Sequence, residues 1–142
     1  MATAETVDMG PPHPPKEESI KAFDEIEVDL KKMLQHLRHD TNKHEPSYFA
    51  AVKFFDDEQL TSFTSADLKE VRVADSAYGK HLFGKVLLPN STSYFMFRAF
   101  IPGGAETARF HCIHMAEIEE KDGQKTFKAI WGEKDPLEWF DE

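Results

Sequence analysis

Four consecutive residues, His111, Cys112, Ile113 and His114, include three side chains of the kinds that bind zinc. On a β-strand successive side chains point to opposite faces of the sheet, so His111 and His114 would lie on different faces. Cys112 and His114 would share a face, but two ligands without a further Cys-x-x-Cys or His-x-x-x-His pair do not complete a zinc site. We therefore expect no metal site at these residues.

Cys112 is also the only cysteine of the chain and its one candidate for a thiol nucleophile. A nucleophilic cysteine needs a lowered pKa and a neighbouring base, whereas strand alternation places Cys112 beside Phe110, where we expect a buried thiol. No Gly-x-Ser-x-Gly motif, phosphate-binding glycine loop or calcium loop occurs. His36 and His39 suit the negative end of a predicted helix. The sequence therefore predicts a protein that is not an enzyme and holds no cofactor.

The aromatic residues of the later part of the chain leave a pocket for a small molecule as an alternative. A curved sheet over a helix encloses such a pocket in many carriers and dehydratases, and a His–Asp pair inside it would be the acid–base couple. The same residues fill an ordinary core equally well, which is the interpretation we favour. They are Phe95, Phe97, Phe110, Phe127 and Trp131.

Composition restricts the class of partner. The chain has 142 residues, 40% of them apolar, which is enough for one domain with its own core. Its formal charge of −9 argues against binding to nucleic acid or to anionic membrane surfaces, because both attract basic proteins. We find no long apolar run and no apolar segment near Met1, so we expect neither membrane insertion nor secretion. These features favour a cytoplasmic protein.

The first part of the chain predicts an arm followed by one long helix. Residues 1–18 contain four prolines and few large apolar groups, which is typical of a flexible arm. Ser19 is the predicted N-cap of an amphipathic helix of about five turns. We expect its apolar stripe to pack on the domain's own sheet; the stripe consists of Phe23, Ile26, Leu30, Met33 and Leu37.

Six later segments alternate between apolar and polar residues or are rich in aromatic and β-branched ones, so they predict strands. They span residues 48–55, 69–74, 81–88, 92–101, 105–118 and 125–131. Pro102, Gly103 and Gly104 predict a central hairpin, and Asp122-Gly123 predicts a second one. The connections are too short for parallel crossovers. The predicted fold class is α+β: one long N-terminal amphipathic helix packed on a curved antiparallel sheet of four to six strands, in a single domain over residues 19–142.

The chain closes with an acidic aromatic tail that contains Leu137, Trp139 and Phe140. Aromatic side chains carry much of the binding energy at protein interfaces, so these residues could anchor the tail in a basic, grooved partner. In the alternative that we weigh equally, the tail docks on its own domain.

Some segments resemble the stefins, the intracellular branch of the cystatins. Residues 49–54 are similar to the Phe-x-Ala-Val-x-Phe strand of stefins, and residues 93–95 are similar to their Asn/Thr-Tyr-Phe strand. The resemblance implies a cystatin-like fold. In inhibitory cystatins an N-terminal glycine, a Gln-x-Val-x-Gly hairpin and a second hairpin enter the cleft of a papain-like protease. Gly10 and Trp131 stand where the glycine and a second-hairpin tryptophan would be, whereas residues 56–89 replace the missing Gln-x-Val-x-Gly motif.

Together these features predict a non-enzymatic intracellular module that binds a protein partner, as an assembly or scaffold factor on a cystatin-like fold. One alternative is a stefin-type inhibitor of papain-like cysteine proteases, which would depend on Gly10 and residues 75–85. Another is a small-molecule-binding or dehydratase-like α+β barrel. An exposed sheet edge within residues 56–89 could pair two copies into a homodimer. The candidate partner-binding residues are Trp139, Phe140, Leu137, Trp131 and Gly10.

Overall fold

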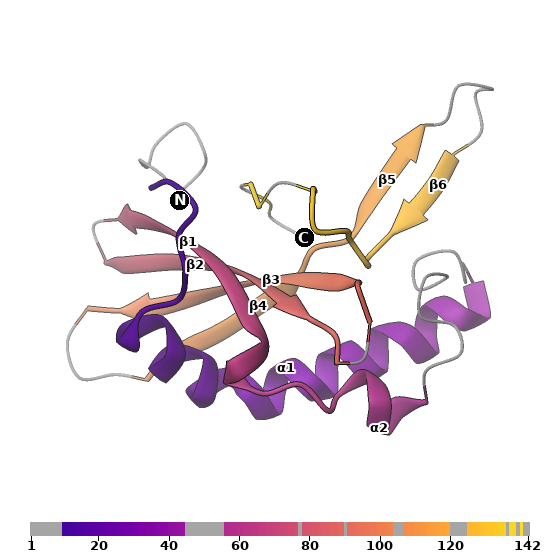
Figure 1. Ribbon diagram of the computed structural model, residues 1–142, viewed down its shortest axis with the longest axis horizontal. Coiled ribbons are helices and arrows are strands. Elements are labelled where there is room, and N and C mark those ends of the chain that lie inside the picture. Colours follow the sequence, from indigo (N-terminus) through magenta and orange to yellow (C-terminus); the bar gives the residue numbers. More distant parts are fainter. Residues whose placement is uncertain are drawn as a thin grey trace.

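The structure, a computed structural model, describes residues 10–44, 56–76, 78–89, 91–103, 107–119, 125–135, 137–138 and 140. One long helix lies on one side of a four-stranded antiparallel sheet, and the C-terminal residues lie on the other side (Figure 1). The α+β fold class is therefore confirmed. The sheet is open, because its first and last strands do not pair. No helix among the described residues is both long and apolar enough to cross a membrane.

Helix α1 (Glu17–His44) begins two residues before the predicted N-cap. Ser19 instead lies in the first turn, where its hydroxyl accepts a hydrogen bond from the backbone N–H of Lys16 and donates one to the Lys16 carbonyl, both at 2.8 Å. This reciprocal pair satisfies a backbone donor that the start of a helix otherwise leaves open. The predicted apolar stripe is buried at Phe23, Ile26 and Leu30, while Met33 is 36% exposed.

The sheet contains β1 (Leu68–Ser76), β2 (Gly79–Leu87), β3 (Tyr94–Pro102) and β4 (Arg109–Ile113), in that order. Three predicted strands and the pairing of the central hairpin are thereby confirmed. Two short helical segments precede the sheet, α2 (Asp57–Leu60) and η2 (Ser65–Asp67). The predicted strand at residues 48–55 lies outside the described residues.

The predicted strand over residues 105–118 is divided into β4 and β5 (Ala116–Glu119), and the predicted last strand is the shorter β6 (Lys125–Lys128). β5 and β6 pair as predicted and form a separate ribbon that projects from the body of the molecule (Figure 1). The chain leaves β3 at His114, which donates its N–H to the Met96 carbonyl at 2.8 Å. It returns at Trp131, which exchanges two backbone hydrogen bonds with Tyr94. The ribbon is therefore an excursion from one edge of β3.

The two faces of the sheet pack against different parts of the chain. The face toward α1 carries a large apolar core that includes Phe23, Phe63 and Phe97, with ring centroids 5.8 to 6.0 Å apart around Phe23. We call the opposite side the outer face. It carries a smaller cluster of Phe83, Met96, Leu137 and Phe140, against which Cys112 and Trp131 pack.

The described part of the proline-rich arm lies along the free edge of β1. Gly10 donates its N–H to the Val73 carbonyl at 2.8 Å, and His13 and Val71 exchange two backbone hydrogen bonds. The arm therefore occupies part of the edge that residues 56–89 would offer to a second copy. The flexibility of the arm and the homodimer stay predictions.

Candidate functional site

Two segments meet at the end of the sheet where β1 turns into β2, and the arm pairs with β1 nearby. Gly103, just after β3, donates its N–H to the carbonyl of Tyr78 in the turn, at 3.0 Å. The arm enters the sheet at Gly10, beside Val73 and three residues before the end of β1. We call this region the turn edge; its members are Gly10, Ser76, Tyr78, Gly79, Pro102 and Gly103.

Tyr78 is exposed while the backbone beneath it is fixed. Its side chain is 84% exposed, more than that of any other large apolar residue in the described part of the chain. Gly79 has φ of +153°, and a Cβ there would overlap the carbonyl oxygen of Ile101, so only glycine suits this position. The Ser76 hydroxyl donates to the Gly79 carbonyl at 3.1 Å. An aromatic ring is thus presented to solvent on a restrained turn.

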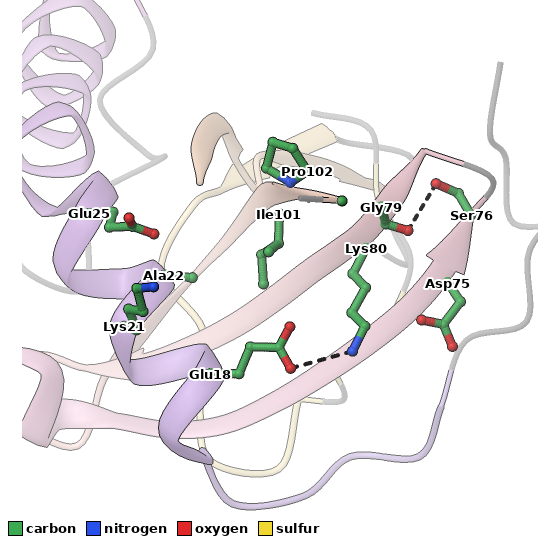
Figure 2. Close-up of a pocket in the computed structure, with 11 residues that line it drawn as sticks. Glu18, Lys21, Ala22, Glu25, Asp75, Ser76, Gly79, Lys80, Ile101 and Pro102 are labelled. Carbon is green, nitrogen blue, oxygen red and sulfur yellow. Dashed lines mark hydrogen bonds and ion pairs between the residues drawn. The ribbon is translucent and has the colours of Figure 1, made fainter. Parts of the chain in front are cut away.

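An open groove of about 470 Å³ lies behind the turn edge, between the first turns of α1 and the sheet (Figure 2). Lys80 reaches from β2 toward Glu18 on α1, with 3.3 Å between Nζ and Oε2, and Asp75 lies nearby on β1. Both partners of this ion pair are exposed, so solvent screens their attraction. His13 and Asp75 line an adjoining recess, but the His13 ring nitrogen lies 2.8 Å from the Pro14 carbonyl oxygen. The groove is therefore polar and open to solvent.

A second site lies on the outer face, where three cationic side chains hold the C-terminal segment. We call the described residues of 132–140 the tail strap. Arg72 on β1 donates to the Leu137 carbonyl at 2.9 Å, and its Nε donates to the Gly10 carbonyl at 2.8 Å. Arg98 on β3 donates to the Phe140 carbonyl at 3.2 Å. Lys85 on β2 is buried and donates to the Glu133 and Asp135 carbonyls at 2.7 Å each.

His114 is stacked between two aromatic rings at this site. Its ring centroid lies 4.6 Å from that of Trp131 and 4.3 Å from that of Phe140, with interplanar angles of 14° and 4°. The Trp131 indole N–H donates to the His114 carbonyl at 3.4 Å. Nδ1 of His114 is buried and makes no hydrogen bond to the described residues. Burial lowers the pKa of His114.

A β-bulge in β4 corrects the predicted faces of the histidine–cysteine segment. The pairing moves from Arg98 opposite Cys112 to Ala99 opposite Phe110, which leaves His111 as the extra residue. The ring of His111 stacks on Phe100, 6.1 Å away, beside His81 and Arg98 on the outer face. The prediction that His111 and His114 diverge is therefore wrong.

The same bulge separates Cys112 from Phe110. Phe110 packs against the helix-side core, and Cys112 packs on the outer face, so the predicted neighbourhood of the thiol is wrong. Burial, and after it the charge of Arg98, lower the pKa of His111. Within the described residues no three His, Cys, Asp or Glu side chains gather as metal ligands.

The structure brings together three of the five predicted partner-binding residues. Trp131, Leu137 and Phe140 meet on the outer face, where Leu137 and Phe140 are buried. Gly10 belongs to the turn edge, and Arg72 bridges it to Leu137 by donating to both carbonyls. Trp131 pairs with Tyr94, at the opposite end of β3 from Pro102, so it does not join the turn edge. Trp139 lies outside the described residues, and the partner-binding role of all five stays a prediction.

Sequence reasoning did not find Arg72 or Arg98, and it included Tyr78 and Lys85 only within the range 75–85 of the inhibitor alternative, without singling out either side chain. Lys85 and Arg98 stand between apolar neighbours in central strands, and this arrangement is a usable signal, because buried cations require acceptors. Tyr78 had no comparable signal, since a tyrosine in a turn is compatible with many environments.

The fold and its two sites define an α+β protein with a restrained turn edge at one end of the sheet and a docked tail on the outer face. Comparison with protein-family models, with curated proteins and with solved structures finds no match to this chain.

Proposed function

We propose that this protein is a non-enzymatic protein-binding module that contacts its partner through the turn edge. The observation that carries the proposal is the exposed ring of Tyr78 on a turn fixed by Gly79 and Gly103. Tyrosine is enriched among the residues that dominate binding energy, because it buries a large area and loses few rotamers. A restrained backbone reduces the ordering cost of association further.

A stefin-type inhibitor of papain-like proteases is the second candidate, on a separate observation. Tyr78 and Gly103 lie together at one end of the sheet, Gly10 pairs with β1 three residues from that end, and the stefin resemblance implies a wedge of three such elements. Two features weigh against it. The Gln-x-Val-x-Gly motif is absent, and Trp131 lies toward the other end of β3.

Photo-crosslinking from the turn edge tests the first proposal. Full-length protein with a benzophenone amino acid in place of Tyr78 is expected to crosslink a discrete partner in an extract of its source cells. The matched control carries the same group at Val28, which is 63% exposed on α1. An identical crosslinking pattern from both positions, or none from position 78, would contradict the proposal.

A titration of papain activity separates the two candidates. An inhibitor would act at nanomolar concentration, and Tyr78→Ala would weaken inhibition by about thirtyfold, the effect of losing about 2 kcal/mol at an interface. Val28→Ala would leave it unchanged. No inhibition at micromolar protein removes the inhibitor candidate and leaves the crosslinking experiment as the test of the module.

A further inference from the structure

The tail strap depends on one aromatic contact as well as on its cationic donors. Phe140 lies flat against His114 on one side and meets the edge of Phe83 at 5.3 Å and 79°. Further strap contacts among the described residues run from Arg72, Lys85 and Arg98, which donate to main-chain carbonyls of the strap. Histidine is the side chain type that changes charge near physiological pH, so His114 is the strap contact to consider as a pH sensor.

The stack accepts a neutral imidazole better than a protonated one. Protonation makes both ring nitrogens donors, and Nδ1 of His114 is buried with no acceptor among the described residues. The facing rings of Trp131 and Phe140 attract a cation, but burial dominates, since it lowers the pKa of His114.

The charged and titratable groups on the outer face come from all four strands of the main sheet, including Arg72 on β1 and His81 on β2. β3 contributes Arg98, which donates to the Phe140 carbonyl. β2 contributes Lys85, a second cation, and β4 contributes His111. In the strap, the Asp135 carboxylate accepts from the Gly132 N–H at 2.7 Å. Desolvation by burial is what lowers the pKa of His114.

We propose that the tail strap is released by acid: protonation of His114 breaks its stack with Phe140, and the strap leaves the outer face. This device is independent of the turn edge. It would expose Leu137 and Phe140, the apolar anchors of the tail, only after the pH falls. At the same time it would uncover Phe83 and Met96 and increase the exposure of Cys112, which is half-buried when the strap is docked.

Proton linkage determines the direction in which pH changes the docking of the strap. Release of the strap removes Phe140 from His114, and the pKa of His114 rises toward the ordinary histidine value of about 6.5, whereas the docked state binds its proton only at lower pH. Docking is therefore fully favoured above that value and weakens as the pH falls below it. The docking equilibrium falls about tenfold for each pH unit between the released and the docked pKa.

Cys112 reports on release, because it is the only thiol of the chain and packs against the cluster that the strap completes. Full-length protein is treated with dithiodipyridine, which reacts in acid as well as at neutral pH, at about pH 7.5 and about pH 5. Glutathione at each pH corrects for the intrinsic reactivity of the thiol. The corrected rate for the wild type is expected to rise severalfold in acid.

Three variants decide whether His114 is responsible. His114→Phe keeps an aromatic ring in the stack and cannot titrate, so its corrected rate should be independent of pH. His111→Phe removes the neighbouring histidine, which also has a lowered pKa but does not stack on Phe140, and it should behave as the wild type does. In Phe140→Ala, Cys112 should be labelled rapidly at both pH values.

The results overturn the proposal if the wild type shows no rise in acid. They also overturn it if His114→Phe shows the same rise, or if His111→Phe abolishes it. Should His114→Phe fail to fold, as judged by circular dichroism, Phe140→Ala keeps the test open. If the corrected labelling rate of Phe140→Ala, in which the strap is already released, still rose in acid, that result would contradict the proposal.

Discussion

The two faces of the sheet are stabilised by different chemistry. On the helix side, large apolar side chains of α1 and of the strands interlock in an extensive core, and α1 also buries Arg38. On the outer face, the side chains of Arg72, Lys85 and Arg98 extend from the sheet and donate to main-chain carbonyls of the tail. A small apolar cluster packs between the sheet and the tail. The helix is held on one face by burial of apolar side chains, and the tail is held on the other by cationic side chains that donate to its main-chain carbonyls.

This difference indicates which face determines global stability and which face can open locally. Burial of large side chains contributes more free energy than hydrogen bonds exchanged with water do. A segment held by carbonyl contacts can also leave without unfolding the strands below it. We therefore expect the helix side to determine global stability and the outer face to determine local opening.

The largest expected effect is Phe23→Ala on the helix side. Phe23 is fully buried and meets Phe63 and Phe97 edge-to-face, so its truncation should reduce the free energy of unfolding by about 3–5 kcal/mol. Denaturant unfolding measures this loss. Val28→Ala on the exposed face of α1 is the control and should stay within about 0.5 kcal/mol of the wild type. Equal effects of the two variants would remove the helix-side core as the source of stability.

An intermediate effect is expected for Lys85→Met on the outer face. Methionine matches the unbranched stem of lysine as far as Cε but lacks the ammonium group, so the Glu133 and Asp135 carbonyls lose a charged donor worth about 1.5–3 kcal/mol. The loss should appear as faster proteolysis of the tail strap, with a smaller change in global unfolding. Lys32→Met, on the exposed surface of α1, is the matched control. A fall in global stability as large as that of Phe23→Ala would erase the distinction between the faces.

The smallest effect is expected for Tyr78→Ala at the turn edge. The ring buries little of its own surface, so the free energy of unfolding should change by less than about 0.5 kcal/mol. Thermal unfolding checks this. A large destabilisation would mean that Tyr78 supports the turn, and its exposure would no longer point to a partner.

The helix-side face could be predicted from the sequence because its residues follow regular periods. Phe23, Ile26 and Leu30 recur at helical spacing. Alternation of apolar and polar residues indicated the strands, and their short connections predicted antiparallel pairing. The pairs β1–β2 and β3–β4 are antiparallel as predicted. The helix start was misplaced because a serine can satisfy the first turn from inside the helix as well as from the N-cap, as Ser19 does toward Lys16.

The outer face was harder to predict because its contacts join distant parts of the chain. A bulge adds one residue to a strand without altering the pattern on either side, so His111 could not be assigned to its face from alternation. The partners of Lys85 lie about fifty residues away and are carbonyls, which every residue carries. The sequence can indicate that a buried cation needs acceptors, but it does not identify the segment that supplies them.

The ribbon of β5 and β6 has a consequence for how this fold can change. Because the chain leaves β3 at His114 and rejoins the same edge at Trp131, the register of the main sheet does not depend on the length of the segment between them. The β5–β6 ribbon can therefore be shortened, extended or exchanged for a foreign peptide with little penalty, provided that Met115, Ala129 and Ile130 at its base keep their places in the helix-side core. It is the natural position for grafting an epitope or a fluorescent reporter, and a place where related chains would tolerate variation in length.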